Sequence, residues 1–229
     1  MATRPIFIPL QGRAATSEGG YRGALVDRLD LSIKWHPGFA ISQKQKNIME
    51  LHNAAEKQGV SPVLEVSTKS TEELGRRLSA FNLKIAVHGV EKSLESVYQS
   101  SKVFSISGQH EILMDVEPFK VKRAVRELGR GKIVAFRFEG KEYPTEPKNA
   151  FYDWLYIKAM APYEDWLRRN LHYAGYSDIE FTPEKSINCQ ARAVAEFHAL
   201  AIRDAVSACT FSFEAFKTLL MYSQRDVLL

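Results

Sequence analysis

From residue 151 to the end of the chain, apolar residues recur at helical spacing, and this long helical region constrains the fold most strongly. Four helices are predicted there, over residues 151–160, 163–174, 188–206 and 211–220. Strand patterns are confined to the first third of the chain and to one segment near residue 135. They cover residues 4–10, 25–35, 63–66 and 132–138. The sequence therefore predicts a mostly helical α+β fold with a few short strands.

The first predicted strand, residues 4–10, contains Pro5 and Pro9. Because proline has no N–H to donate to a neighbouring strand, we expect this segment at the edge of a sheet. Residues 11–23 carry several glycines among polar residues and are predicted to form a loop.

Further helices are expected between the strands. Ser42 is a plausible N-cap for a helix over residues 43–57, and Gly59 would end it. Shorter helices are predicted from residue 70 to 77 and from 118 to 128.

The composition bounds the class of protein. With 229 residues, 45% of them hydrophobic, the chain can bury a core as one domain or as one domain with an extension. The net charge of +4 and the pI near 9.0 permit a nucleic-acid partner but do not require one. Cys189 and Cys209 are expected to be reduced, and the histidines show no ligand spacing, so no metal or cofactor is predicted. The sequence has no signal-peptide pattern and no long apolar run, which indicates a cytoplasmic protein.

The stretch from Ser93 to Phe104 carries the main chemical signal. In a helix, Glu95, Gln99 and Lys102 would lie on one stripe at i, i+4 and i+7. A carboxylate, an amide and an amine placed together could transfer protons and attack an electrophilic sugar carbon. The alternative is a solvated polar face, and spacing alone does not decide between the two.

The segments LSAFNL (residues 78–83) and SLESVYQSSKVF (residues 93–104) resemble the signature of the NADAR (YbiA-like) family. There, a small-Asn-Phe motif precedes a helix with the pattern Glu-His-Tyr-Phe-Gln-x-x-Lys. Glu95, Gln99 and Lys102 stand at the Glu, Gln and Lys positions, whereas Ser96 replaces the histidine.

The resemblance continues over most of residues 63–205. Its further matches are Val66-Ser67, Gly129-Arg130, Asp153-Trp154 with Lys158, and the turn from Asp178 to Pro183. The Trp-Gly that follows this turn in the family has no equivalent, because Asn188-Cys189 occupies its place. We divide the sequence into an N-terminal extension (1–62), a NADAR-like catalytic core (63–205) and a C-terminal helix (206–229).

The resemblance implies an N-glycosidase that removes ADP-ribose from guanine in nucleic acid, with DNA favoured and RNA left open, as the antitoxin to a DarT-like ADP-ribosyltransferase. Lys102 would be the nucleophile, forming a Schiff base with the opened ribose, and Glu95 would move protons or stabilise positive charge. Two alternatives stay open. One is cleavage of riboflavin-pathway intermediates, and the other is a non-catalytic antitoxin that binds its toxin.

The residues expected to bind the ligand are Gln99, Ser67, Phe81, Asn82, Trp154, Asn188 and Arg192. Trp154 could stack on a base or on adenine, or else belong to an aromatic core. Asn188 and Arg192 would lie at the start of a helix, where N–H groups favour a phosphate, or would simply cap it.

A basic, aromatic turn over residues 34–47 is a second candidate for binding nucleic acid. This N-terminal extension is absent from compact members of the family and resembles that of NADAR proteins paired with DarT-type toxins. The alternative is an ordinary solvated helix start.

Overall fold

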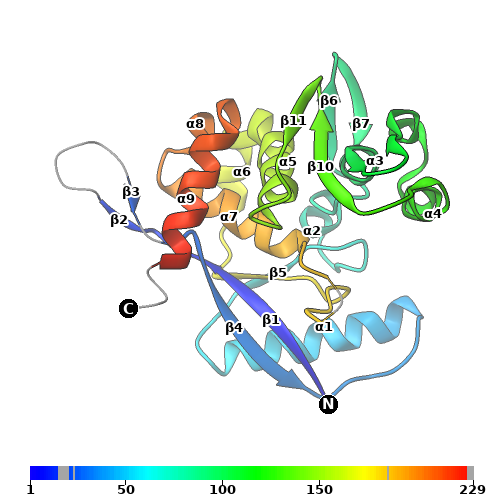
Figure 1. The fold of residues 1–229 in the computed structure, drawn as a ribbon. Coiled ribbons are helices and arrows are strands. Elements are labelled where there is room, and N and C mark those ends of the chain that lie inside the picture. Colours follow the sequence, from blue (N-terminus) through cyan, green and yellow to red (C-terminus); the bar gives the residue numbers. More distant parts are fainter. Residues whose placement is uncertain (15–20, 23, 185, 226–229) are drawn as a thin grey trace.

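The structure, a computed structural model, describes residues 1–14, 21–22, 24–184 and 186–225. Its lower part is a four-stranded sheet in the order β4-β1-β12-β5 (Figure 1). The strands are β1 (Ala2–Pro9), β4 (Val26–Ile33), β5 (Val63–Glu65) and β12 (Gly175–Ser177). Helix α1 (Ile41–Glu56) packs against this sheet through Ile48, Leu51 and Ala55, which form a small core with Ile6 and Ile33.

The prediction that the first strand lies at an edge was wrong. β1 pairs with β4 along its whole length, from Ala2↔Ile33 to Pro9↔Val26, and with β12 on its other side. The second pairing has a single register pair, Phe7↔Tyr176. An interior strand can contain two prolines here because its pairing with β12 is short and needs few backbone N–H donors.

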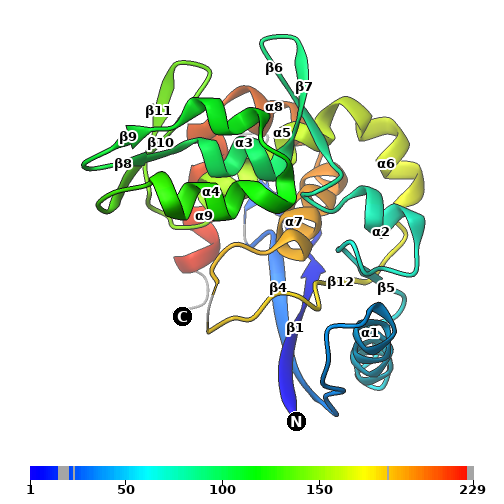
Figure 2. The same ribbon diagram turned by 90° about the vertical axis from the view of Figure 1, so that its right-hand side faces the viewer.

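A second four-stranded sheet, in the order β11-β10-β8-β9, lies in the upper part of the molecule beside α3 and α4 (Figure 2). Its strands are β8 (Lys102–Phe104), β9 (Gly108–Gln109), β10 (Ile133–Phe138) and β11 (Lys141–Tyr143). Two short ladders complete the strands: β6 (Lys84–Val87) with β7 (Val90–Ser93), and β2 (Arg13–Ala14) with β3 (Tyr21–Arg22).

Helix α5 (Ala150–Met160) forms the centre of the main core. Every residue in it except Lys158 is buried, so it has no solvent-facing stripe. It packs against α7 (Gln190–Ile202), α3 (Leu94–Ser100), α8 (Val206–Phe211) and α9 (Phe213–Arg225). The remaining helices are α2 (Glu73–Arg77), α4 (Pro118–Leu128) and α6 (Glu164–Asn170), with 3-10 turns over Glu111–Asp115 and Ala161–Tyr163.

The predicted α+β class is confirmed, and most predicted elements are present. α1 begins at Ile41 with Ala40 as its N-cap, so Ser42 is inside the helix and does not cap it. The helix predicted over 188–206 ends at Ile202, where Asp204 adopts a positive φ of 53°. The loop predicted over 11–23 contains the β2–β3 ladder, and residues 15–20 and 23 lie outside the described part of the chain.

Both cysteines are free and buried, as expected. The first sheet joins β1 and β4 of the N-terminal extension to β5 and β12 of the core, so the sheet crosses the boundary drawn at residue 62. Within the part of the chain that the structure describes, no helix has both the length and the apolar character needed to traverse a lipid bilayer.

A buried carboxyl joins the neighbouring strands β5 and β12 at their C-terminal ends. Glu65, at the end of β5, accepts hydrogen bonds from Ser67 Oγ (2.7 Å) and Ser177 Oγ (2.5 Å). It also accepts one from the Ile179 backbone N–H (2.9 Å). Burial raises the pKa of Glu65 to about 8, and the nearby charge of Asp178 makes the next largest contribution to this rise. The folded protein therefore holds a proton on Glu65 that the unfolded chain releases at lower pH.

We expect this proton to make stability depend on pH. Since the folded pKa of Glu65 lies above its unfolded value of 4.5, its contribution is full below pH 4.5 and is lost as the pH rises towards 8. The free energy of unfolding should fall over this range, by at most about 1.4 kcal/mol per pH unit from this group. Urea unfolding of Glu65→Gln should show a flatter profile, most clearly above the pKa of about 6 of Asp178. Glu56→Gln, which alters an exposed carboxylate on α1, is the matched control. Equal slopes in both variants would contradict the assignment.

Candidate active site

Glu95, Gln99 and Lys102 are joined by hydrogen bonds in the structure. Gln99 Nε2 donates to Glu95 Oε1 at 2.9 Å, and Lys102 Nζ donates to Gln99 Oε1 at 2.5 Å. The Lys102 amine also lies 4.9 Å from the centroid of the Tyr98 ring, a cation–π contact. The amide of Gln99 therefore connects the carboxyl to the amine.

The prediction that one helix carries all three residues was wrong. α3 ends at Ser100, and Lys102 is the first residue of β8. The hydroxyls of Ser100 and Ser101 both bond to the Val97 carbonyl, while the Ser101 carbonyl accepts the N–H of Arg137 in the second sheet. Pairing with β10 thus replaces the next helical turn, and the long lysine side chain still reaches back to Gln99.

The alternative of a solvated polar face is excluded by burial. Glu95 is 9% exposed and Gln99 is 5% exposed. Burial lowers the pKa of Lys102 to about 8; Glu95 opposes this shift, and the positive charges of Lys122 and Arg126 add to it. Burial also raises the pKa of Glu95, against the Gln99 hydrogen bond and the charges of Lys122 and Lys102. The site therefore holds an amine that loses its proton near neutral pH and a carboxyl that retains one more readily than usual.

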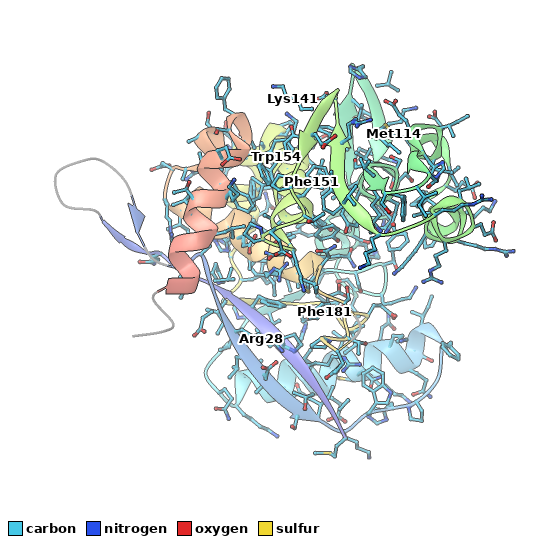
Figure 3. The ribbon with its side chains drawn as sticks, in the orientation of Figure 1. Arg28, Met114, Lys141, Phe151, Trp154 and Phe181 are labelled. Atoms are coloured by element: carbon cyan, nitrogen blue, oxygen red, sulfur yellow. The ribbon has the colours of Figure 1, made fainter. Side chains whose placement is uncertain are left out.

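Glu95 lines a pocket of about 410 Å³. Its other lining residues come from distant parts of the chain: Phe81, Pro118, Phe119, Lys122, Tyr152, Asp178, Glu180, Phe181, Ser186, Asn188 and Gln190. Phe181 lies between the lower sheet and the helices above it (Figure 3). A second pocket, of about 620 Å³, shares Ser186 and Asn188 with the first and is lined by Tyr98, Thr145 and Glu146, among others. The two pockets therefore meet at Asn188.

The turn that carries Phe81 is fixed from two sides. The Ala80 carbonyl accepts the N–H of Glu95 at 3.0 Å, and the Ala80 N–H donates to Gln190 Oε1 at 2.7 Å. The β6–β7 hairpin occupies the sequence between Phe81 and Glu95. This explains the spacing of the two motifs, because the hairpin leads the chain away and returns it beside its starting point.

Asn188 lines both pockets but lies before α7, whose N-cap is Cys189, and not in the first helical turn where it was predicted. Its Nδ2 donates to the Tyr98 hydroxyl at 2.5 Å, and its Oδ1 is buried without a hydrogen-bond partner among the described residues. A buried acceptor without a partner is costly, so a ligand that donates to this oxygen would be stabilised there. The structure thus places Glu95, Phe81 and Asn188 on one pocket, with Gln99 and Lys102 joined to Glu95 by hydrogen bonds.

Trp154 is placed elsewhere, which corrects the prediction that it stacks on a ligand. It is 4% exposed, its Nε1 donates to the Cys209 carbonyl at 3.0 Å, and Tyr143 and Phe213 pack against its ring. Figure 3 shows it beside Phe151 in the interior. The aromatic core occupies the ring faces that a ligand would need.

Three other predicted ligand residues make contacts within the protein. Arg192 pairs with the buried Asp153, with Nη2 2.9 Å from Oδ2. The Ser67 hydroxyl donates to Glu65, and Asn82 Nδ2 donates to the Arg76 carbonyl. Asn82 instead lines a separate pocket of about 450 Å³, bounded by residues of α2 and α6.

Sequence reasoning missed Asp178 and Gln190 as pocket residues. Gln190 Nε2 donates to Asp178 Oδ2 at 3.1 Å, and burial raises the pKa of Asp178 to about 6. The available signal was an acidic residue at the start of a turn, directly after the short segment that forms β12. The basic turn over residues 34–47 reaches the pocket rim through Lys44, whose Nζ lies 3.1 Å from Glu180 Oε1.

The pKa shift of Lys102 predicts unusual reactivity. Limited acetylation with acetic anhydride, read by peptide mass spectrometry across pH 6–11, should show a midpoint near pH 8 for Lys102. The side-chain amine of Nα-acetyl-lysine in the same tubes should show a midpoint near pH 10.4. Glu95→Gln removes a charge that raises the Lys102 pKa, so the midpoint should move to lower pH. A midpoint equal to that of free lysine would show that burial does not perturb this amine.

Comparison with known proteins places these residues in a family. No curated protein matches the chain. Residues 2–227 match the sequence model of the family described as DarT1-associated NADAR antitoxin. The match includes the N-terminal extension as well as residues 63–205, where the resemblance was found. The chain is therefore a member of the DarT1-associated NADAR antitoxin family.

Proposed function

We propose that this antitoxin is an N-glycosidase that removes ADP-ribose from guanine in nucleic acid, with DNA as the favoured substrate, and so reverses the action of a DarT-type toxin. The observation that carries the proposal is the half-buried Lys102 amine, which Gln99 joins to Glu95 on the wall of a pocket. Its pKa of about 8 leaves part of it neutral at physiological pH, as nucleophilic attack requires.

In the first step, the neutral Nζ of Lys102 donates its electron pair to the anomeric carbon of the ribose. The bond from that carbon to the guanine nitrogen breaks, and the nitrogen leaves with the bonding pair and takes a proton from the Glu95 carboxyl. Burial of Glu95 favours its protonated form, which suits it to this role. The transition state has oxocarbenium character, which the Glu95 carboxylate stabilises as it forms.

In the second step, the ribose ring opens to give a protonated Schiff base on Lys102. Water adds to the imine carbon, and the Glu95 carboxylate accepts a proton from that water. Collapse of the carbinolamine releases ADP-ribose and regenerates the amine. One water is consumed in each cycle, and Gln99 holds both reacting side chains in place throughout.

The pocket supports a ligand with both aromatic and polar parts. Phe81 offers a ring at one wall, and Asn188 Oδ1 is an acceptor available to a donor group of the ligand. We assign these two residues to binding, with Gln99 as a positioning residue. Trp154 and Arg192 are not part of the proposal, because their side chains are engaged in the protein interior.

The activity test uses a DNA oligonucleotide ADP-ribosylated on guanine. The protein should release free ADP-ribose, and Lys102→Ala should reduce kcat at least about 10³-fold, because the covalent route is lost. Lys141→Ala, at an exposed position on β11, is the control and should keep full activity. Circular dichroism should show both variants folded.

Two results would contradict the proposal. Intact substrate in the presence of wild-type protein would exclude the glycosidase reaction on DNA and direct the assay to RNA and to riboflavin-pathway intermediates. Protection of cells from a DarT-type toxin by folded Lys102→Ala would show that the antitoxin acts by binding its toxin.

A further inference from the structure

Helix α4 (Pro118–Leu128) carries two distinct sets of basic residues. Lys120 pairs with Glu117, and Arg123 pairs with Glu127, as ordinary neighbours on an exposed helix. Lys122 and Arg126 form no ion pair with any of the residues that the structure describes. They are four residues apart and therefore share a face of the helix.

Phe119 lies on the same face, three residues before Lys122. It is 70% exposed although it is one of the larger apolar side chains. Its ring stacks on Phe81 with a centroid distance of 4.7 Å and an interplanar angle of 23°. One face of Phe119 is therefore supported by a second ring, and much of the remainder meets solvent. Such platforms hold unpaired nucleobases by stacking.

We call Phe119, Lys122 and Arg126 the α4 stripe. It begins at the candidate active site, because Phe119 and Lys122 line the pocket together with Glu95. Arg126 continues the stripe by one helical turn, and both cations lie close enough to Lys102 to lower its pKa. Helix α4 lies beside α3 and forms an outer surface of the molecule (Figure 2).

Other residues that line the pocket differ from α4 in charge. Asp178 and Glu180 are acidic, and Lys44 pairs with Glu180. A polyanion that enters the pocket would therefore be attracted along α4 and repelled near Asp178 and Glu180. Charge complementarity selects the α4 stripe as the path of the strand.

We propose that the α4 stripe binds the single-stranded DNA next to the modified guanine, with the neighbouring base stacked on Phe119 and its phosphates on Lys122 and Arg126. This inference rests on the proposed function and adds to it the surface that holds the polymer. It follows that the protein recognises a strand, beyond the ADP-ribosylated nucleoside itself. Base pairing would remove the free base that Phe119 needs, so a duplex should bind less well.

Binding can be tested without catalysis, by fluorescence anisotropy with an unmodified, labelled oligonucleotide of about 12 nucleotides. Phe119→Ala should weaken binding by roughly ten-fold. Arg126→Gln should weaken binding and reduce the slope of log Kd against log salt by about 0.7, the value for one phosphate contact on a single strand. Lys120→Gln removes the same charge from α4 at a residue that does not line the pocket, and it should leave affinity and slope unchanged. Equal effects of Arg126→Gln and Lys120→Gln, or wild-type binding by Phe119→Ala, would overturn the inference.

A second measurement separates this inference from the proposed function. For each variant, kcat/KM is measured on ADP-ribosylated oligonucleotide and on ADP-ribosyl-guanosine. Phe119→Ala and Arg126→Gln should each lower the ratio of the oligonucleotide value to the nucleoside value at least five-fold. The ratio is used because Arg126 also affects the Lys102 pKa, which changes both rates alike. If no substrate is cleaved but the anisotropy pattern holds, the glycosidase reaction fails and the DNA surface stands. If both substrates are cleaved and the ratio is unchanged, the function stands and the surface fails.

Discussion

Removing a lysine amine from water costs free energy, and the surroundings of Lys102 both impose this cost and offset part of it. Gln99 accepts a hydrogen bond from the amine, and the Tyr98 ring provides a cation–π contact. Glu95 is held on the far side of the Gln99 amide and supplies a compensating charge when ionised. The part of the cost that is not offset appears as a pKa of about 8. Packing thereby produces an amine that is partly neutral at physiological pH, which is the form that the proposed mechanism requires.

This arrangement depends on segments far apart in the sequence. Helix α3 ends at Ser100 because the chain then joins the second sheet, with Lys102 as the first residue of β8. Helix α5 supports α3 through the contact of Tyr98 with Tyr152. On the other side, Gln190 joins the Phe81 turn to Asp178. The charge of Asp178 in turn adds to burial in raising the pKa of Glu65, at the end of β5. The N-terminal extension is therefore connected to the pocket residue Asp178 through the sheet that β1 forms with β12 and β5.

The sequence was most informative where spacing and chemistry agreed. Glu95, Gln99 and Lys102 were identified correctly as neighbours even though the assumed helix ends before Lys102. A long side chain tolerates that error, because its amine can reach the same point from a strand. Helix α4 was predicted with both its ends, since Pro118 and Gly129 mark them and the apolar residues follow a clear period.

Other features could not be predicted, for physical reasons. Helix α5 is buried almost all round, so its sequence does not distinguish a ligand-facing Trp154 from a core one. The position of β1 inside its sheet depends on its pairing with β12, whose one register pair joins Phe7 to Tyr176, about 170 residues later in the chain. The partner of Arg192 is likewise set by the packing of α7 on α5, which brings Asp153 to it. Tertiary contacts of this kind leave no local pattern.

The proposed mechanism depends on a covalent bond between Lys102 and the ribose during the reaction. This bond is tested by adding borohydride during turnover of ADP-ribosylated DNA and mapping the reduced adduct by peptide mass spectrometry. We expect one ADP-ribosylated site, on the peptide that contains Lys102, with the guanine already released. An adduct on another lysine, or turnover with no adduct at any time point, would contradict it.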